Sequence, residues 1–298
     1  MNDAESCQSE SSIRFNCKEI KDAIKNMKRG KSPGHDGLSI EHLQNAGIHM
    51  PGVLTMFFNL CKGHSYVPQE MLDTIVVSIV KNRTGDIADK GNSRPISLAT
   101  VKAKVFDSVL DSRIGGYVQL HDSQFGFRSK LSTESAIFAL KHAVKYYSDR
   151  KTPVYACFLD LSKAFDLVSY DILWEKLRKS GISESLISIL SIWYDNQRNF
   201  VKWLNALSEP YKFGCGVRQG GLSSPRLFNI YINELLVKLS STHVGCHIDG
   251  EYVNNLSYAD DMVLLSPSIC GIRKLISICE GYAKQHGLIY NPKKSELL

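Results

Sequence analysis

Two adjacent aspartates between two apolar runs restrict the fold of this chain more than any other feature. Residues 255–258 (NLSY) lead toward Asp260 and Asp261, and residues 262–265 (MVLL) follow them. Apolar runs joined by so short a link are typical of a β-hairpin with a tight turn. Adjacent carboxylates at an ordered turn repel each other unless cations neutralise them, and hard divalent ions such as Mg²⁺ prefer oxygen ligands. The pattern therefore predicts a cation site at a hairpin tip, with a solvated acidic turn as the commoner alternative for Asp-Asp alone.

A third carboxylate lies upstream in a similar setting. Residues 153–159 (PVYACFL) form a short, nearly all-apolar run that ends at Asp160. Such a run is expected of a strand that is covered on both faces. With Asp160 beside the hairpin, the site would hold two Mg²⁺ ions roughly 3.5–4 Å apart. The three acids therefore predict phosphoryl transfer that depends on positioning and charge neutralisation. Asp166, six residues after Asp160, is predicted to be a structural acid rather than a ligand.

Hydrophobic periodicity predicts the elements around these motifs. Asn16, with Glu19 three residues later, has the pattern of a capping box that opens a helix. Residues 200–203 and 210–213 are predicted to pair as strands. The remaining predictions are a strand at 74–80, a hairpin tip at 81–93, and helices at about 101–117, 133–147, 172–179, 184–193, 225–239 and 272–283.

Three segments carry a resemblance to a known family. Residues 158–166 (FLDLSKAFD) are similar to the first palm motif of reverse transcriptases, and residues 258–261 (YADD) to their catalytic hairpin. Between them, residues 216–225 (GVRQGGLSSP), followed by 227–233 (LFNIYIN), resemble the loop and helix that lie against the incoming nucleotide and the template base. The order and spacing of the three segments also fit the family.

Four further segments resemble the enzymes of non-LTR (LINE-type) retrotransposons: residues 31–38 (KSPGHDGL), 92–98 (NSRPISL), 124–128 (QFGFR) and 286–294 (HGLIYNPKK). The resemblance implies an α+β fold with right-hand polymerase fingers and palm, and an antiparallel palm sheet backed by helices. We assign residues 1–14 to a disordered N-terminus, 15–150 to the fingers region and 151–298 to the palm, with the reverse transcriptase domain at about 60–298. The chain stops at Leu298, just past the lysine motif, so we expect no primer-grip hairpin or thumb within it.

The resemblance also implies the ligands of the metal centre. Asp160 and Asp260 would be the principal ligands of two Mg²⁺ ions, for which Mn²⁺ can substitute. Asp261 would bind only in some states. The backbone carbonyl of Leu161 is a further candidate ligand.

Other matching residues would contact the incoming nucleotide. Phe165, five residues after Asp160, stands where the family keeps an aromatic ring that excludes a ribose 2′-hydroxyl. An ordinary core aromatic is the alternative for Phe165. Gln219 matches a residue that contacts the nucleotide, and Gly220 one that lets the backbone approach the template base. The family often has Pro where this chain has Arg218, which leaves the conformation of the loop open.

The triphosphate and the template complete the predicted site. Arg94, and Lys81 as a second candidate, would hold the triphosphate, since a guanidinium binds phosphate oxygens bidentately. A solvated lysine at a strand end is the alternative for Lys81. Lys293 or Lys294 would donate a proton to the pyrophosphate, and the choice between them stays open. Three residues would face the template backbone without reading its sequence: Phe127, Arg128 and Lys130. A surface charge cluster is the alternative for these residues.

Composition agrees with this prediction without being specific to it. The chain has 298 residues, enough for one large or two smaller domains, and its apolar share is 43%. A net charge of +6 and a pI near 8.8 admit an anionic partner but lack the strong basic signature of a dedicated nucleic-acid binder. Eight cysteines without a Cys-x-x-Cys pair predict free thiols in an intracellular protein of the nucleus or the cytoplasm. We expect neither a secretion signal nor a membrane partner.

The sequence thus predicts an RNA-directed DNA polymerase of a non-LTR retrotransposon, which adds dNTPs to a DNA primer 3′-end on an RNA template. Two alternatives stay open. A catalytically inactive, transposon-derived nucleic-acid-binding remnant is favoured by the expected lack of a thumb and opposed by the complete set of site residues. An RNA-dependent RNA polymerase shares the palm chemistry, but Phe165 opposes it. The sequence does not indicate the oligomeric state.

Overall fold

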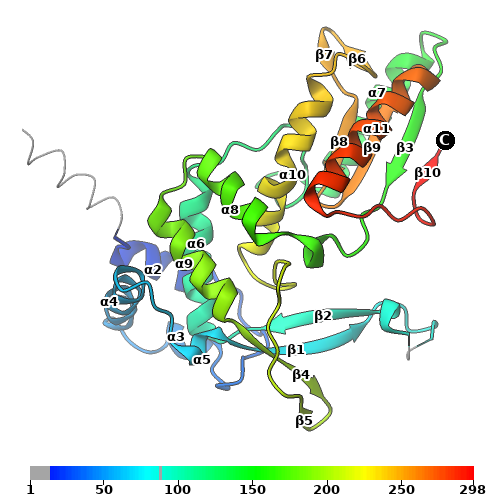
Figure 1. Ribbon diagram of the computed structural model, residues 1–298. Coiled ribbons are helices and arrows are strands. Elements are labelled where there is room, and N and C mark those ends of the chain that lie inside the picture. Colours follow the sequence, from blue (N-terminus) through cyan, green and yellow to red (C-terminus); the bar gives the residue numbers. More distant parts are fainter. Residues whose placement is uncertain (1–13, 87–88) are drawn as a thin grey trace, which may run out of the picture. The chain divides into compact units, whose positions relative to one another are not determined.

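The computed structural model describes residues 14–86 and 89–298. Of the segment predicted to be disordered, residues 1–13 lie outside the described residues. The described chain divides into two compact units (Figure 1). The first contains the described residues up to Tyr117, together with Leu177–Gly214 and Arg218–Ser223. The second contains Val118–Lys176, Cys215–Val217 and Ser224–Leu298. The boundary placed at residue 150 on sequence grounds differs from this division, because residues 118–150 belong to the second unit.

Both units combine helices and strands, which confirms the α+β class. The elements of the first unit are α2 (Cys17–Asn26), α3 (Ile40–Gln44), α4 (Met50–Gly63), α5 (Gln69–Leu72), β1 (Asp73–Val80), η1 (Lys90–Asn92), β2 (Ser93–Leu98), α6 (Val101–Gly115), α9 (Glu184–Asn196), β4 (Arg198–Trp203) and β5 (Ala206–Leu207). The elements of the second are α7 (Thr133–Ser148), β3 (Tyr155–Leu159), η2 (Ala164–Leu167), most of α8 (Tyr170–Lys179), α10 (Ser224–Ser240), β6 (His247–Ile248), β7 (Glu251–Tyr252), β8 (Asn255–Tyr258), β9 (Asp261–Ser266), α11 (Ile269–His286) and β10 (Glu296–Leu297).

The first helix begins at the predicted capping box. The Asn16 side chain accepts a hydrogen bond from the Glu19 amide at 3.0 Å, and the Glu19 carboxylate accepts one from the Asn16 amide at 2.9 Å. Arg113 of α6 binds the same carboxylate, with 2.6 Å between Nε and Oε1. A local sequence pattern therefore both starts α2 and ties it to α6.

Aromatic stacking forms the core of the first unit. Phe106 of α6 stacks on Phe58 of α4 with ring centroids 4.7 Å apart, and on Trp193 of α9 at 5.4 Å. Phe15 meets Phe106 edge-on at 5.8 Å. Phe58, Phe106 and Trp193 are fully buried. These rings hold three helices together through a large buried apolar surface.

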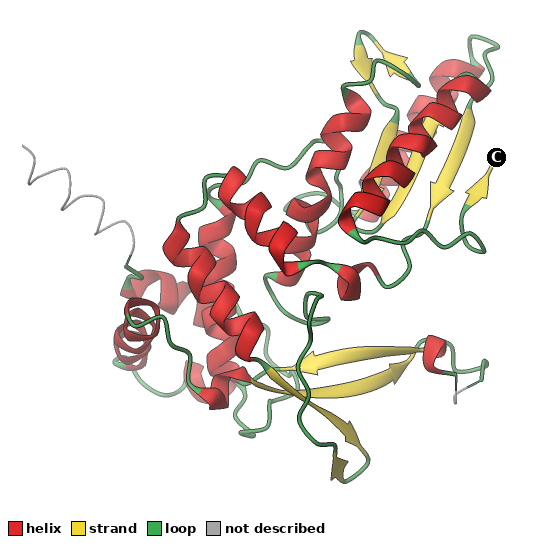
Figure 2. Ribbon diagram, in the orientation of Figure 1, coloured by secondary structure: helices red, strands yellow, loops and turns green. Residues whose placement is uncertain are grey.

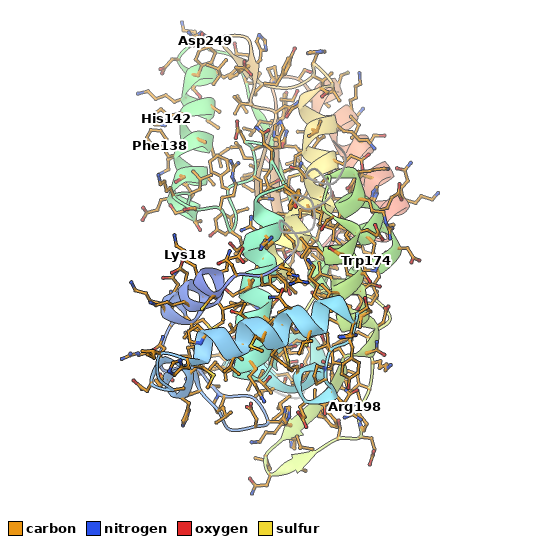
Figure 3. The ribbon with its side chains drawn as sticks, turned by 90° about the vertical axis from the view of Figure 1, so that its left-hand side faces the viewer. Lys18, Phe138, His142, Trp174, Arg198 and Asp249 are labelled. Carbon is orange, nitrogen blue, oxygen red and sulfur yellow. The ribbon has the colours of Figure 1, made fainter. Side chains whose placement is uncertain are left out.

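The sheet of the first unit has the strand order β2-β1-β4-β5. β1 and β2 form the predicted antiparallel hairpin, while β4 runs parallel to β1. The register sets Asp73 opposite Arg198, and the guanidinium of Arg198 (Figure 3) donates to both carboxylate oxygens at 2.8 and 2.7 Å. This bidentate pair aligns the first residues of two strands that are distant in sequence.

The predicted partner of β4 was wrong. β4 pairs with β5, after a turn that begins at Leu204 with a φ of +52°. Residues 210–213 form no strand in the described structure, and only a single bridge joins Tyr211 to Asn199. The chain reverses directly after Trp203 through Leu204-Asn205, a turn that contains no glycine, so a single asparagine was the only turn signal in the sequence.

The second unit is built on an antiparallel sheet with the order β10-β3-β9-β8. Figures 1 and 2 show α11 in front of these strands and α7 behind them, and both helices contact the sheet. Behind it, Ala143 and Tyr147 of α7 pack against Leu256, Val263 and Leu265. Helices on both faces explain why β3 and β9 are nearly all apolar, as their sequences predicted.

A buried ammonium group joins α8, α10 and α11 in this unit. The Lys176 side chain is only 8% exposed, and its Nζ lies 2.6 Å from Glu234 Oε2. The same Nζ is 5.3 Å from the ring centroid of Tyr282, while Lys238 binds Glu234 at 2.8 Å. Hydrogen bonds from Lys176 and then Lys238 lower the pKa of Glu234 to about 2.

We expect acid to weaken the fold through Glu234. Its pKa falls from 4.5 to about 2 on folding, so its contribution to stability is present above pH 4.5 and disappears as the pH drops through 2. Urea unfolding between pH 2 and 7 should therefore show a smaller pH dependence for Glu234→Gln than for the wild type. Solvent screening reduces the stabilisation that the ion pairs of Glu234 contribute, because the Glu234 side chain is partly exposed. Glu251→Gln, on exposed β7, should keep the wild-type pH profile. Equal profiles for wild type and Glu234→Gln would contradict this prediction.

The cysteines in the described part of the chain have free thiols: Cys17, Cys61, Cys157, Cys215, Cys246, Cys270 and Cys279. Of the helices in residues 14–86 and 89–298, none is both long enough and apolar enough to span a bilayer.

Candidate active site

The predicted aspartate hairpin is present in the second unit. β8 and β9 pair with Tyr258 opposite Asp261, so Ala259 and Asp260 form a two-residue turn. Ala259 has a φ of +58°, in the left-handed region that favours glycine. Hairpin turns of this length require a positive φ because it matches the twist of the two strands. The turn that carries Asp260 is therefore strained at an alanine.

The strand that precedes the third aspartate lies beside this hairpin. β3 pairs antiparallel with β9, and Leu159 is opposite Met262. Asp160 follows Leu159, and Asp261 precedes Met262, so the antiparallel register brings two of the predicted acids to the same end of the sheet. This juxtaposition joins residues that are about one hundred positions apart in the sequence.

The segment after α11 supports Asp160 from the other side. The Asn291 amide donates to the Asp160 carbonyl at 2.8 Å, and the Asp160 amide donates to Ser295 Oγ at 3.3 Å. Lys294 Nζ lies 3.6 Å from Asp160 Oδ1. The side chains of Lys293 and Lys294 are both exposed. The structure thus brings the Lys294 side chain close to Asp160. The sequence, which has two adjacent lysines, did not indicate which of them would lie there.

Leu161 follows Asp160 in a bridge with Tyr290. The bridge consists of the bond from Asn291 to Asp160 and a 2.7 Å bond from the Ser162 amide to the Ile289 carbonyl. Neither of these two bonds uses the Leu161 carbonyl, so the bridge leaves that oxygen for another donor or cation.

The acids form a negatively charged, partly desolvated site. Asp261 is exposed to solvent, yet protein around its carboxylate and the charge of Asp160 both raise its pKa, and Lys294 opposes the rise. A bound cation would relieve both causes, and the donors are the oxygen ligands that Mg²⁺ prefers. The donor set therefore fits a divalent metal. Within the described residues, no three His, Cys, Asp or Glu side chains are already gathered as a metal-binding group.

Residues 123–126 support the hairpin along the outer edge of β8. The Phe125 amide donates to the Ser257 carbonyl at 2.8 Å, and the Ser257 amide donates to the Ser123 carbonyl at 2.8 Å. Gln124 Oε1 accepts from the Ala259 amide at 2.9 Å, which ties the segment to the turn itself. The segment forms a single parallel bridge with β8, and it is attached to the turn by a side chain.

Phe165 lies in η2, within the second unit. Its ring stacks on that of Phe228 of α10, with centroids 5.0 Å apart and planes at 15°. The Val217 amide donates to the Phe165 carbonyl at 2.7 Å. Phe165 is half-buried and Phe228 is fully buried. The stack restrains the ring of Phe165.

Gln219 and Gly220 lie in a loop held against β2 in the first unit. The Ser97 amide donates to the Gln219 carbonyl at 2.8 Å. Gly220 has a φ of +108°, and a Cβ there would lie 3.0 Å from the Ser97 carbonyl oxygen. Glycine is therefore required for conformation and for space. Arg94 lies on the same strand as Ser97, and Lys81 follows β1, so four candidate nucleotide-binding residues belong to the first unit.

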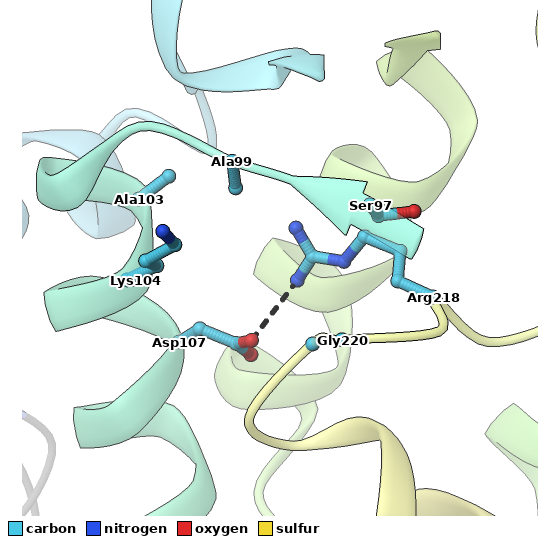
Figure 4. A pocket seen from close by; sticks show the side chains of 8 residues that line it. Ser97, Ala99, Ala103, Lys104, Asp107, Arg218 and Gly220 are labelled. Atoms are coloured by element: carbon cyan, nitrogen blue, oxygen red, sulfur yellow. Dashed lines mark ion pairs between the residues drawn. The ribbon is translucent and has the colours of Figure 1, made fainter. Parts of the chain in front are cut away.

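A buried ion pair anchors this loop (Figure 4). Arg218 Nη2 lies 3.3 Å from Asp107 Oδ2, and each side chain is 4% exposed. Asp107 also accepts from the Leu222 amide at 2.8 Å and from Ser223 Oγ at 2.5 Å. The Arg218 guanidinium lies 4.6 Å from the ring centroid of Trp193. Arg218, where the family often has Pro, is thus the anchor that determines the conformation of the loop.

A small cavity with room for about one water molecule lies beside this pair. Ser97, Lys104 and Gly220 line it together with Arg218 and Asp107. Arg218 Nε is buried and has no hydrogen-bond partner in the described part of the chain.

Two other candidates, Lys81 and Arg128, form hydrogen bonds with nearby backbone carbonyls. Lys81 Nζ donates to the Gly91 carbonyl at 3.1 Å, across the tip of the β1–β2 hairpin. Arg128 donates to the carbonyls of His121 at 3.0 Å and Gln124 at 3.2 Å. These bonds support a structural role for both side chains in the state described.

The remaining template candidates are exposed. Phe127 is 57% exposed with a φ of +56°, and Lys130 is exposed with a φ of +65°. Sequence reasoning did not assign a role to Asp107 in the first unit, or to Gln124 and Asn229 in the second. Asn229 Nδ2 donates to the Gly126 carbonyl at 2.8 Å. The only available signal was a polar residue at a buried position of an otherwise apolar helix face.

Comparisons with known proteins identify the family. The family model described as reverse transcriptase (RNA-dependent DNA polymerase) matches residues 79–298. The Pol polyprotein from type-1 retrotransposable element R2 of Popillia japonica is 27% identical over 280 residues, which cover 93% of this chain and 38% of that protein. The probable RNA-directed DNA polymerase from transposon BS of Drosophila melanogaster is 27% identical over 289 residues, which cover 93% of this chain and 31% of that protein.

Solved structures show the same fold. Apo telomerase from Candida tropicalis, truncated from its C-terminal domain, has a TM-score of 0.55 at 14% identity, over 84% of this chain and 55% of that chain. The likeness supports the predicted polymerase fingers-and-palm fold. The chain spans about a third of the length of the curated relatives named above. Those relatives confirm the resemblance to non-LTR retrotransposon enzymes, and the family match covers most of the sequence: the chain belongs to the reverse transcriptase family.

Proposed function

We propose that this chain catalyses RNA-directed DNA synthesis for a non-LTR retrotransposon. It would add dNTPs to the 3′-end of a DNA primer on an RNA template. The observation that carries the proposal is the meeting of Asp160 with the Asp260-Asp261 hairpin at one end of the β3–β9 pair. Burial and then the charge of Asp160 raise the pKa of Asp261, and a carboxylate in such surroundings suits a site that binds cations and polyphosphate.

Each acid has a proposed role in this reaction. Asp160 and Asp260 would hold two Mg²⁺ or Mn²⁺ ions, with Asp261 as a ligand in some states and the Leu161 carbonyl as a further one. When bound, the metals supply Lewis-acid activation of the primer 3′-hydroxyl and charge neutralisation at the pyrophosphate. The contact of Lys294 with Asp160 favours Lys294 over Lys293 as the proton donor to pyrophosphate.

The nucleotide and the template would be bound by the other candidates. Gln219 and Gly220 would contact the incoming nucleotide and the template base. Arg94 would hold the triphosphate, and Lys81 is a second candidate for the same role. Phe127 and Lys130 are proposed to meet the template backbone; Arg128 would join them only on leaving its own loop. The free thiols support an intracellular location, in the nucleus or the cytoplasm.

Primer extension tests the proposal. The chain is incubated with a DNA primer on an RNA template, with Mg²⁺ or Mn²⁺ and with either dNTPs or rNTPs, and fluorescence anisotropy measures primer–template binding. Extension with dNTPs supports the proposed activity. Binding without extension in either metal supports a nucleic-acid-binding remnant instead, and preferential extension with rNTPs supports an RNA polymerase.

Phe165→Val should relax the choice of sugar. A smaller side chain leaves room for the 2′-hydroxyl, so we expect kcat/KM for rNTPs relative to dNTPs to rise roughly 10- to 200-fold. Single-nucleotide incorporation with matched dNTP and rNTP pairs measures the ratio. Phe138→Val, on the exposed face of α7 (Figure 3), should leave it unchanged. An unaltered ratio in Phe165→Val would assign Phe165 to the core instead.

A further inference from the structure

We infer that Gln124 is a positioning residue for the catalytic turn, and that it acts by holding the backbone that carries Asp260. The inference rests on the proposed function, because the orientation of Asp260 matters for that reaction. Gln124 would act through the turn, without contact to substrate or metal.

The hydrogen bonds of Gln124 determine its orientation. Oε1 accepts from the Ala259 amide at 2.9 Å and from the Gly126 amide at 2.8 Å. Both partners are donors, so the oxygen and not the amide nitrogen must face them. The residue is 0% exposed, and its Nε2 has no hydrogen-bond partner in the described residues. Gln124 is therefore held by one oxygen that joins two backbone amides.

The turn needs such support because its conformation is unfavourable for alanine. A φ of +58° at Ala259 is disfavoured for any residue with a Cβ, and it persists only where surrounding contacts impose it. The bond from Ala259 to Gln124 is a contact of this kind. It satisfies the amide of the strained residue itself.

The segment that carries Gln124 is itself held in place by Gly126 and Asn229. A Cβ on Gly126 would collide with the Ala259 amide nitrogen, so only glycine lets this segment approach the turn. Asn229 of α10 then binds the Gly126 carbonyl at 2.8 Å, and Asn229 is buried. A continuous path of hydrogen bonds thus runs from α10 through Gly126 and Gln124 to the turn before Asp260.

Catalysis is sensitive to the position of Asp260. A displacement of about 1 Å in a reacting group can cost on the order of 10²-fold in rate. Loss of the Gln124 acceptor should therefore reduce kcat, whereas dNTP binding by other residues should change little.

Gln124→Met tests this inference, because methionine has a similar length but no comparable acceptor. We expect kcat for primer extension to fall about 10- to 100-fold, with KM for dNTP changed less than about threefold. Ala259→Gly in the same chain should restore kcat at least about fivefold, because glycine adopts the positive φ without strain. A residue needed only for folding would show no such rescue. Gln285→Met, on the exposed face of α11, is the matched control.

Hydrogen exchange gives a readout that needs no activity. The amide of Ala259, followed in residues 255–262, should exchange faster in Gln124→Met than in wild type, while β3 is unchanged. Asn229→Ala should have a smaller effect in the same direction and serves if Gln124→Met does not fold. Unchanged exchange, or a kcat within about twofold of wild type, overturns the inference. An inactive wild type with faster exchange in the variant counts against the proposed function and leaves the support of the turn established.

Discussion

Asp260→Asn/Asp261→Asn should lower the rate of dNTP incorporation at least about 10³-fold while leaving the protein folded. The substitution removes both charges at the hairpin tip and keeps the size of each side chain. Because protein surroundings and Asp160 already disfavour the charged form of Asp261, its neutralisation relieves repulsion. We therefore expect a thermal unfolding temperature equal to or above that of wild type. Loss of activity without loss of stability would assign the acids to chemistry.

Primer extension and thermal unfolding of the same preparations measure this prediction. Asp249→Asn makes the same chemical change in the exposed turn between β6 and β7 (Figure 3), and it should keep wild-type activity. Extension by the double variant at more than about a tenth of the wild-type rate would show that these aspartates are not the metal ligands.

Asp107→Ala should destabilise the fold by about 3–5 kcal/mol, because it leaves the buried guanidinium of Arg218 without its counter-ion. It also removes the acceptor of the Leu222 amide and of Ser223 Oγ. The loop that carries Gln219 would lose its anchor, so KM for dNTP should rise in the folded fraction. Urea unfolding measures the free energy, and single-nucleotide kinetics measure KM.

The double variant Asp107→Ala/Arg218→Met gives the matched test. Removal of both charges should cost less than the sum of the single changes, since neither charge is then left unpaired. Asp22→Ala, on the exposed face of α2, should change the free energy of unfolding by less than about 0.5 kcal/mol. Additive losses in the double variant would mean that the two side chains are not coupled.

Much of the local structure was predictable from short patterns. The capping box at Asn16 and Glu19 starts α2, and the apolar runs around Asp260 and Asp261 form the β8–β9 hairpin. Patterns of this kind work because the interacting groups lie within a few residues of each other. The partner of β4 was mispredicted because its turn, Leu204-Asn205, lacks the glycine that usually follows asparagine in a two-residue hairpin turn.

Supporting residues were much harder to predict. Asp107 has no local sequence signal, and Gln124 was noted only as part of the segment 124–128. Each residue contacts a partner more than one hundred positions away. The choice of Lys294 over Lys293 likewise depends on which side chain lies beside Asp160. No local pattern contains these distances, because they result from the packing of several helices and strands.

By itself, the sequence identified the family, predicted the elements and pointed to the three acids that we propose as metal ligands, because these depend on residue type, order and short-range periodicity. The tertiary structure alone decided how the acids and their loops are held. Pairing of β3 with β9 brings Asp160 to Asp261, and the buried pair of Asp107 and Arg218 shapes the Gln219 loop. The physical reason is that a buried charge or a strained turn is stable only where distant elements together supply its partners.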